Sequence, residues 1–239
     1  MINTKDRLIV ALDVDTEKES LDLIEKLSPI VNVFKVGIAP FTGYGHSLLR
    51  KIEEKNKKVF LDLKFHDIPN TVSNAAYQAA DKKVFMMNFH CMGGEKMLKA
   101  AVDGAKKRGD TRTILLGVTV LTSMSEEDLS AIGISGSVES KVMEFAASAK
   151  RAGLDGVVAS AKEIKKIKEQ CGKDFLVVTP GIRPAWSEAN DQKRIVTPEK
   201  AIADGADYIV VGRPIIADKD PLGAAKKVME EIERAEKNK

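Results

Sequence analysis

The sequence predicts an α/β fold, a (β/α)8 TIM barrel formed by a single domain over residues 1–239. The first observation behind this prediction is that short β-branched apolar runs recur eight times, each followed by a charged or amphipathic stretch. Strands that alternate with helices indicate a parallel sheet. The second observation is length, because 239 residues divided among eight units give about 30 each, the size of a strand, a helix and their loops. Eight such units close a barrel, which typically takes about 250 residues.

The eight predicted strands, taken in order, are apolar runs of strand length. They are LIVALDV from Leu8, VFKVG from Val33, VFLDLKF from Val59, VFMMNFH from Val84, TILLGVTVLT from Thr113, DGVVAS from Asp155, DFLVVTPG from Asp174 and DYIVVG from Asp207. Between them, apolar residues recur at spacings of three and four, as in amphipathic helices. Examples are TEKESLDLIEKL, GEKMLKAAVDGAKKR, VESKVMEFAASAKRAG and PLGAAKKVMEEIERAEK. A doubly wound open sheet is the alternative, but it normally carries fewer strands in this length.

The composition argues against several classes of protein. Hydrophobic residues make up 44% of the chain, enough for a sizeable core, and charged residues of both signs make up 31%. A nucleic-acid binder usually has a basic stripe interleaved with aromatic residues, whereas the net charge here is +3 and aromatic residues make up 5%. The apolar runs are shorter than the roughly 18 residues that span a membrane. We therefore expect a soluble protein with neither a nucleic-acid nor a membrane partner.

Cysteine usage and the first residues predict a cytoplasmic location. Cys91 and Cys171 stand far apart and form no CxxC motif, which favours a reducing compartment. The opening segment MINTKDRLIVALDV lacks the layout of a signal peptide, because its apolar run is typical of a strand and is broken by Asp13.

Charged residues at the ends of the early strands are the main functional signal, because function in this fold gathers at the carboxyl ends of the strands. Side chains alternate along a strand, so Asp62 and Lys64 are expected to share the face of VFLDLKF that points into the barrel. Lys35, on the preceding strand, is the expected neighbour of Asp62, and Asp67 follows in the loop. Buried charges are costly and buried pairs stabilise weakly at best. A catalytic role is therefore favoured over an ion-pair ladder that only fixes the barrel.

A phosphate site is predicted at the ends of the last two strands. VTPGIRP places Gly181 and Arg183 after the seventh strand, and IVVGRPI places Gly212 and Arg213 after the eighth. The loops at these two positions commonly bind phosphate in this fold. Glycine lets backbone N–H groups approach an anion, and arginine holds it with a planar fork. Turn glycines beside surface arginines are the simpler alternative.

Metal and cofactor motifs are missing from the sequence. The three histidines, His46, His66 and His90, do not have the spacing of metal ligands, and the last two are expected to form hydrogen bonds near the site. The chain contains neither the GxxxxGK[ST] phosphate-binding loop nor the GxGxxG dinucleotide motif. We expect no metal and no cofactor.

The segment DLKFHDIPNT at Asp62–Thr71 resembles the signature of the orotidine 5′-monophosphate decarboxylases, D-x-K-x-x-D-I-x-N-T. The resemblance runs nearly end to end, since ALDV, KVG, VTVLTS, TPGIRP and VGRPI follow in the family's order and spacing. It implies a homodimeric barrel that converts orotidine 5′-monophosphate to UMP and CO2, the last step of de novo UMP synthesis, without a metal or cofactor.

The resemblance also assigns roles to residues. It implies that Lys64 donates a proton to C6 of the pyrimidine, within an alternating network of Lys35, Asp62, Lys64 and Asp67. The implied substrate contacts are Asp13 and Lys35 at the ribose hydroxyls, Asp62 near the substrate carboxylate, Thr122 and Ser123 at the pyrimidine, and Arg183, Gln192, Gly212 and Arg213 at the phosphate. Asp67 and Thr71 would reach in from the partner subunit.

Other functions remain open at this point. A 3-keto-L-gulonate 6-phosphate decarboxylase shares D-x-K-x-x-D but uses Mg²⁺ held by acidic residues, including a glutamate at the end of the second strand, where this chain has Lys35. A phosphosugar isomerase or epimerase would need a carboxylate or histidine base. A non-catalytic nucleotide-binding barrel would keep Arg183 and Arg213 but would not need Lys64.

Overall fold

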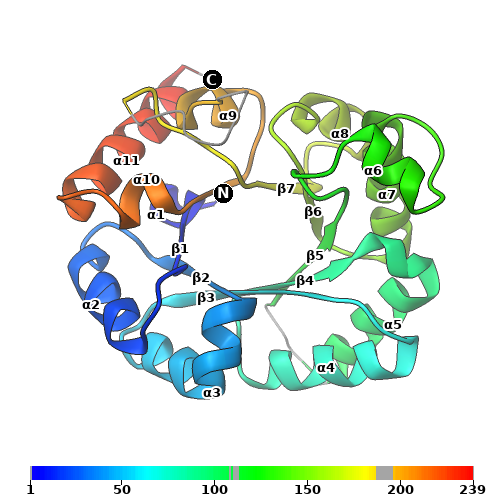
Figure 1. Cartoon of the computed structure of the whole chain (residues 1–239), viewed down its shortest axis with the longest axis horizontal. Coiled ribbons are helices and arrows are strands. Elements are labelled where there is room, and N and C mark those ends of the chain that lie inside the picture. The colour runs from blue at the N-terminus through cyan, green and yellow to red at the C-terminus, as the bar shows by residue number, and fades with distance from the viewer. Residues whose placement is uncertain (1, 108, 110–112, 187–195, 239) are drawn as a thin grey trace. The chain divides into compact units, whose positions relative to one another are not determined.

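The computed structural model describes residues 2–107, 109, 113–186 and 196–238. Its strands are parallel and form a closed barrel in chain order, which confirms the (β/α)8 fold (Figure 1). The strands are β1 (Leu8–Ala11), β2 (Val33–Gly37), β3 (Lys58–Phe65), β4 (Met86–His90), β5 (Ile114–Val118), β6 (Gly156–Val158), β7 (Leu176–Thr179) and β8 (Tyr208–Val211).

Each connection between consecutive strands contains a helix, and those between β4 and β5 and between β5 and β6 contain two. The helices are α1 (Thr4–Arg7), α2 (Glu17–Leu27), α3 (Ile38–Glu54), α4 (Pro69–Asp81), the 3₁₀ turn η1 (Cys91–Gly93), α5 (Gly94–Lys106), α6 (Glu126–Ala131), α7 (Val138–Ala152), α8 (Ile164–Cys171), α9 (Pro198–Ala203), α10 (Arg213–Ile216) and α11 (Pro221–Lys237). The four amphipathic stretches named from the sequence correspond to α2, α5, α7 and α11.

Local sequence signals explain where several helices begin and end. Thr16 and Glu19 form a capping box at the start of α2, in which each side chain bonds the backbone N–H of the other. Ser125 and Asp128 do the same at α6. Gly153 ends α7 with φ of 90°, a left-handed conformation that glycine adopts without a Cβ penalty.

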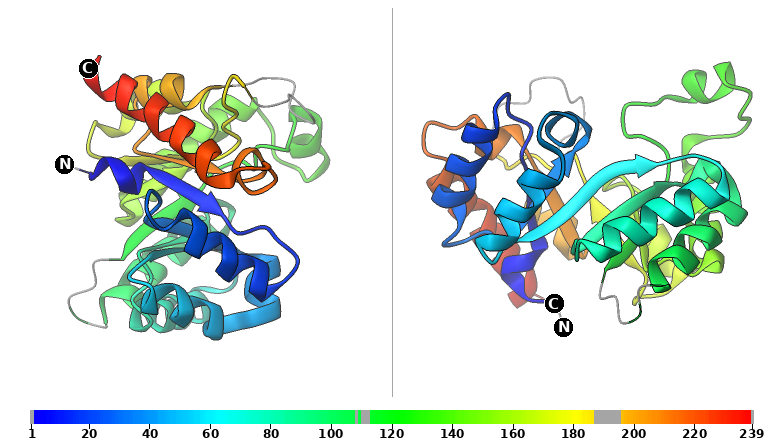
Figure 2. Two further views of the ribbon diagram at one scale, coloured as in Figure 1. Left: turned by 90° about the vertical axis from the view of Figure 1, so that its left-hand side faces the viewer. Right: turned by 90° about the horizontal axis from the view of Figure 1, so that it is seen from below.

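Contacts divide the chain into two compact units, of which the first is Met1–Leu63 with Thr179–Lys239. In this unit β8, β1, β2 and β3 pair in that order. Helix α11 packs against α9, α2 and α1. The two ends of the chain lie together (Figure 2), where Thr4 Oγ1 donates a hydrogen bond of 2.7 Å to Glu236 Oε2.

The second unit is Lys64–Val178, with β4, β5, β6 and β7 paired in order. Helices α4 and α5 lie side by side in it (Figure 1). They approach so closely that a Cβ at Gly104 would lie 2.1 Å from the carbonyl oxygen of Ser73. Only glycine permits this spacing, so one residue type sets how the two helices pack.

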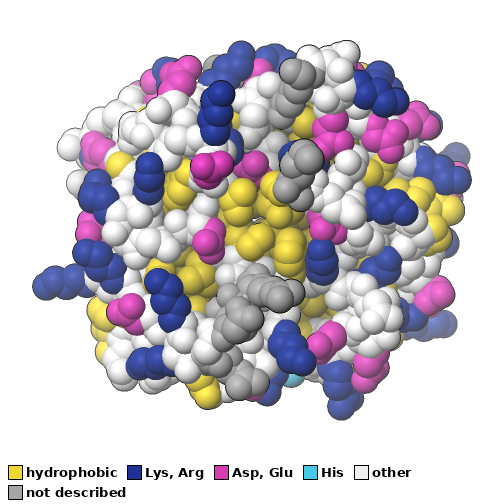
Figure 3. Space-filling view, turned by 180° about the vertical axis from the view of Figure 1, so that it is seen from behind, with side chains coloured by type: hydrophobic (Ala, Val, Ile, Leu, Met, Phe, Trp, Pro, Cys, Tyr) yellow, Lys and Arg dark blue, Asp and Glu magenta, His cyan; other side chains and the backbone are white. Residues whose placement is uncertain are grey.

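The surface carries mixed charge, as the sequence suggested. Lysine and arginine side chains are interspersed with aspartate and glutamate over the face shown in Figure 3. Within the described residues, no helix has both the length and the apolar character that crossing a membrane requires.

Candidate active site

A lysine between two carboxylates stands at the carboxyl ends of the first three strands. Lys35 Nζ on β2 lies 3.2 Å from Asp62 Oδ2 on β3 and 3.3 Å from Asp13 Oδ1, which follows β1. The Lys35 and Asp62 side chains are each 12% exposed, whereas the Asp13 side chain is 56% exposed. The predicted pairing of Lys35 with Asp62 is confirmed. One cation is thus shared by two carboxylates, and this cluster is open to solvent on the Asp13 side.

Gly37 at the end of β2 makes room for the shared ammonium. A Cβ at this position would lie 3.0 Å from Lys35 Nζ and 3.5 Å from Asp13 Oδ1. Any side chain here would push against the lysine. The sequence analysis did not single out Gly37, although it is the glycine of the KVG segment.

Lys64, two residues beyond Asp62 on β3, has a backbone conformation that the sequence did not predict. Its φ is 51°, in the left-handed region, which costs a non-glycine residue about 1–2 kcal/mol. Its N–H donates a hydrogen bond of 2.8 Å to Oδ1 of Asn88 on β4. The rule that side chains alternate between the two faces of a strand assumes an extended backbone. The direction of the Lys64 side chain therefore also depends on its left-handed backbone conformation. Such strain concentrates at functional sites.

Two histidines lie in the same unit as Lys64. The rings of His66 and His90 stack with centroids 5.5 Å apart and planes at 19°. His90 Nδ1 accepts a hydrogen bond of 3.4 Å from the N–H of Met92, which requires that nitrogen to be unprotonated. Burial, and then the nearby positive charges of His66 and Lys64, lower the pKa of His90 below its ordinary value. The predicted hydrogen-bonding role is confirmed for His90, which is neutral at pH 7.

Asp67, Ile68 and Thr71 are exposed on the loop after β3 and the first turn of α4. Asp67 Oδ1 accepts a hydrogen bond of 2.6 Å from the N–H of Ile68, which keeps this turn compact. Ile68 is 66% exposed, and two other isoleucines of the described residues, Ile38 and Ile132, are also more than half exposed. Thr122 and Ser123 are also exposed, in the loop between β5 and α6.

The residues predicted to bind phosphate differ in how far they are exposed to solvent. Gly181 has φ of 75°, so the turn after β7 requires glycine. Arg183 is only 6% exposed, and its backbone N–H donates a hydrogen bond of 3.1 Å to the backbone carbonyl oxygen of Val196. Gly212 precedes α10, and the Arg213 side chain that follows it is exposed. Gln192 lies outside the described residues.

Two of the predicted substrate-binding residues border one cavity. Asp13 and Arg213 both line a cavity of about 550 Å³ in the first unit. A carboxylate that can bind hydroxyl groups and an arginine that can bind an anion therefore line the same cavity.

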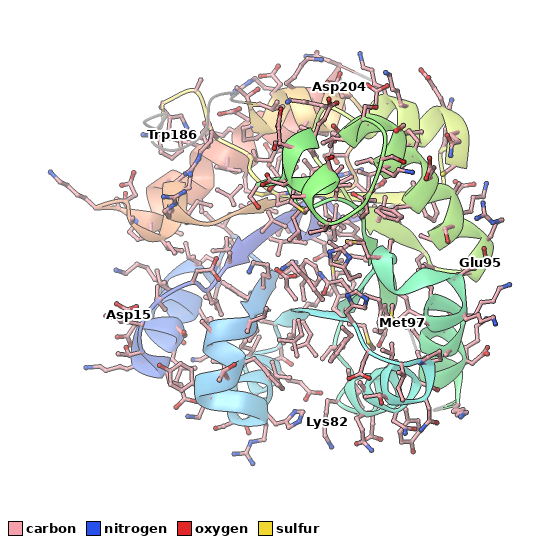
Figure 4. All side chains as sticks on the ribbon, turned by 45° about the vertical axis from the view of Figure 1, so that its right-hand side comes forward. Asp15, Lys82, Glu95, Met97, Trp186 and Asp204 are labelled. Carbon is pink, nitrogen blue, oxygen red and sulfur yellow. The ribbon has the colours of Figure 1, made fainter. Side chains whose placement is uncertain are left out.

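Trp186, which follows Arg183 in the chain, lies beside α11 (Figure 4). Lys227 Nζ on this helix is 5.0 Å from the centre of the Trp186 ring.

The described residues include no group of three or more histidine, cysteine, aspartate or glutamate side chains arranged to hold a metal ion. Asp13 and Asp62 come together, but the Lys35 ammonium lies between them.

Comparison with known proteins gives a consistent result. The model of the "Orotidine 5′-phosphate decarboxylase / HUMPS family" matches residues 6–228. An orotidine 5′-phosphate decarboxylase of Syntrophotalea carbinolica is 47% identical over 239 residues, covering 98% of each chain. One from Carboxydothermus hydrogenoformans is 50% identical, covering 95% of this chain and 96% of the relative. A crystal structure of orotidine 5′-phosphate decarboxylase from Lactobacillus acidophilus superposes with a TM-score of 0.84 at 38% identity, covering 95% of this chain and 99% of that one.

Proposed function

Because the chain belongs to the orotidine 5′-phosphate decarboxylase / HUMPS family, we propose how its residues carry out the decarboxylation of orotidine 5′-monophosphate to UMP and CO2. The observation that carries the proposal is Lys35 held between Asp13 and Asp62, with Lys64 two residues further along β3. Alternating charges at the carboxyl ends of barrel strands are suited to a reaction in which a carboxylate leaves and a carbanion forms.

The chemical step needs a cation beside C6 of the pyrimidine. The C6–carboxylate bond breaks, CO2 leaves, and the electron pair stays on C6. The Lys64 ammonium stabilises this charge as it develops and then transfers a proton to C6, which gives UMP and a neutral amine that regains a proton from solvent. The strained backbone of Lys64 supports this role, because strain is retained where a fixed geometry is needed.

Asp62 lies beside the substrate carboxylate in this proposal. It acts either by disfavouring the bound substrate or by orienting Lys64. An Asp62→Asn variant separates these roles. If the carboxylate destabilises bound substrate, KM falls together with kcat, whereas a role in orientation lowers kcat and leaves KM unchanged.

The other residues hold the substrate in place. Asp13 and Lys35 bind the ribose hydroxyls, and Thr122 and Ser123 contact the pyrimidine. The phosphate is bound by Arg183, Gln192, Gly212 and Arg213. Binding energy from the phosphate, which is remote from C6, holds the charged groups in order at the reacting centre.

We propose that the reaction uses neither a metal nor a cofactor. The Mg²⁺-dependent sugar-phosphate decarboxylases are the closest alternative, and they need acidic metal ligands at the position of Lys35. In this chain the Lys35 ammonium already neutralises part of the charge of Asp13 and Asp62, and it would repel a divalent ion.

The functional unit in this proposal is a homodimer of single-domain chains in the cytoplasm. Asp67 and Thr71 are supplied to the active site of the partner subunit, and the exposed Ile68 between them is buried at the interface. Burial of the exposed Ile68 side chain there would remove apolar surface from water, which favours association. The buried free thiols of Cys91 and Cys171 are compatible with a reducing compartment.

The reaction and its metal independence are tested together. The purified chain is mixed with orotidine 5′-monophosphate, and the loss of the substrate's ultraviolet absorbance is followed with and without EDTA. We expect turnover at equal rates in both. Turnover that EDTA abolishes would favour the Mg²⁺-dependent alternative, and binding without turnover would favour a non-catalytic nucleotide-binding barrel.

The shared active site is tested by mixing two inactive variants, Lys64→Ala and Asp67→Ala. If Asp67 acts across the interface, half of the dimers after exchange are mixed, and each has one intact site, so about a quarter of the wild-type activity returns. If Asp67 acts within its own chain, the mixture stays inactive.

A further inference from the structure

The backbone of Lys64 is held in its left-handed conformation by a side chain. In a parallel sheet, N–H groups ordinarily donate to carbonyl groups of the neighbouring strand. The N–H of Lys64 instead donates to the side-chain oxygen Oδ1 of Asn88, over 2.8 Å. The position of a backbone carbonyl oxygen on β4 is fixed by the register of the sheet. A side-chain oxygen on β4 can instead reach an N–H group that no longer points along the regular hydrogen-bond direction of the sheet.

The burial of the Asn88 side chain is energetically unfavourable for the folded state. It lies in the middle of β4 and is 0% exposed, and a buried amide is costly unless it is hydrogen-bonded. By strand alternation Asn88 shares a face with His90, whereas Phe89 points to the other face, where its ring lies 5.8 Å from that of Phe65. The apolar neighbours Met86 and Met87 show that this strand tolerates hydrophobic side chains on both faces.

Two contacts with β4, one at Lys64 and one at the next residue, hold the backbone conformation of Lys64. Phe65, the next residue, is fixed by its packing against Phe89, and the N–H of Lys64 is fixed by Asn88. Both partners come from the same short strand, β4. The twist at Lys64 is therefore clamped between two residues that are adjacent in sequence.

We propose that Asn88 is a positioning residue for the reaction: its Oδ1 holds the backbone of Lys64 in the left-handed conformation that aims the ammonium at the reacting carbon. This inference rests on the proposed role of Lys64 as proton donor. Asn88 itself touches neither the substrate nor the leaving group in this scheme, and it acts only through Lys64. A displacement of about 1 Å at a reacting group can lower a rate about 10²-fold.

The test uses two substitutions of nearly equal volume. Asn88→Leu removes the acceptor, and Asn88→Asp keeps an oxygen at the Oδ1 position. We expect Asn88→Leu to lower kcat about 10- to 100-fold with KM changed less than about threefold, and Asn88→Asp to retain most of kcat. A crystal structure of Asn88→Leu is expected to show that φ of Lys64 has left the positive range.

Thr113→Val is the matched control for the loss of a part-buried hydrogen bond in the same unit. Thr113 Oγ1 donates to the carbonyl of Val84 over 2.8 Å, just before β5 begins. We expect Thr113→Val to lower the melting temperature without changing kcat. A purely structural role for Asn88 would make Asn88→Leu behave like this control, with a lower melting temperature and unchanged kcat, and that result would overturn the inference.

Failure of the inference is distinguishable from failure of the proposed mechanism. If Lys64→Ala is inactive while Asn88→Leu keeps its kcat, Lys64 is the proton donor but Asn88 does not position it. If Lys64→Ala itself turns over normally, the proton-donor assignment is wrong, and the inference falls with it. Equal losses in Asn88→Asp and Asn88→Leu would also contradict it, because the retained acceptor oxygen should preserve the conformation.

Discussion

The two ends of the first strands carry charged clusters of similar composition but different geometry. At the amino ends, Asp6 is 7% exposed and uses both oxygens, accepting from Lys58 Nζ at 2.6 Å and from Asn32 Nδ2 at 2.9 Å. At the carboxyl ends, Lys35 lies 3.2 and 3.3 Å from two carboxylates, one of them largely exposed. The first cluster contains one carboxylate and one ammonium, whereas in the second one ammonium is shared by two carboxylates.

This difference distinguishes a structural cluster from a functional one. The amino-terminal cluster has short bonds and matched charge, so it stabilises the fold and offers little to a ligand. The carboxyl-terminal cluster has longer distances and a carboxylate, Asp13, that is largely exposed and therefore available to a substrate. The general division of this fold, with stability at the amino ends and function at the carboxyl ends, is thus visible in the hydrogen bonds of three strands.

The largest expected effect is at Lys64. Lys64→Ala removes both the cation and the proton donor, so kcat should fall by at least about 10⁴-fold, measured by loss of ultraviolet absorbance. Lys64→Gly should be equally inactive but more stable than Lys64→Ala by about 1 kcal/mol in urea unfolding, because glycine accommodates the positive φ. Near-normal turnover in either variant would show that Lys64 is not the proton donor.

The next effect compares the two clusters directly, through Lys35→Met and Lys58→Met. Each change removes one cationic partner of a buried aspartate, and we expect each to lower the free energy of unfolding by about 2 kcal/mol. Only Lys35→Met should also lower kcat/KM, by about 10³-fold, because Lys35 is part of the charge network and binds the ribose. A comparable activity loss in Lys58→Met would mean that the two ends are not functionally distinct.

A smaller effect is expected at the phosphate. Arg213→Ala should lower kcat/KM for orotidine 5′-monophosphate about 10²-fold and leave the already poor turnover of orotidine unchanged, because only the former has a phosphate to bind. Arg234→Ala is the control, since Arg234 is an exposed arginine paired with Glu199. If Arg213→Ala affected both substrates equally, the arginine would not be acting through the phosphate.

Much of the fold was predictable because it depends on local pattern. Each of the eight predicted strands is present, although six of the eight apolar runs are longer than their strands. The run from Thr113 to Thr122 contains a strand that ends at Val118, after which Thr119 still bonds the neighbouring strand through its N–H and Oγ1 before the chain turns away. Apolar residues indicate which part of the chain is buried, and the chain stays buried beyond the last residue that pairs with the neighbouring strand.

The charge network was predictable in part, for a similar reason. Lys35 and Asp62 stand near the carboxyl ends of consecutive strands, so their pairing follows from topology. The left-handed φ of Lys64 and the bond from its N–H to Asn88 depend on contacts distant in sequence and on one unusual backbone torsion, neither of which has a local signature. The burial of Arg183 was missed because a Gly/Arg motif does not reveal which arginine the chain covers.

The smallest expected effect is on stability and involves His90, the last residue of β4. Burial lowers its pKa below the ordinary value of 6.5, which the unfolded chain retains. Between these two values the unfolded state binds more protons than the folded state, so the free energy of unfolding decreases as the pH falls below about 6.5, by at most about 1.4 kcal/mol per pH unit. Above that range His90 is neutral in both states and contributes no pH dependence.

Urea unfolding at pH values from 7.5 down to 5.5 measures this slope. His90→Gln, which keeps an acceptor for the N–H of Met92, should flatten it, and His46→Gln on the exposed surface of α3 controls for the loss of one histidine. A slope in His90→Gln equal to that of the wild type would assign the acid sensitivity to other groups. A flattened slope would show that the burial of His90 at the carboxyl end of β4 has a stability cost that can be titrated.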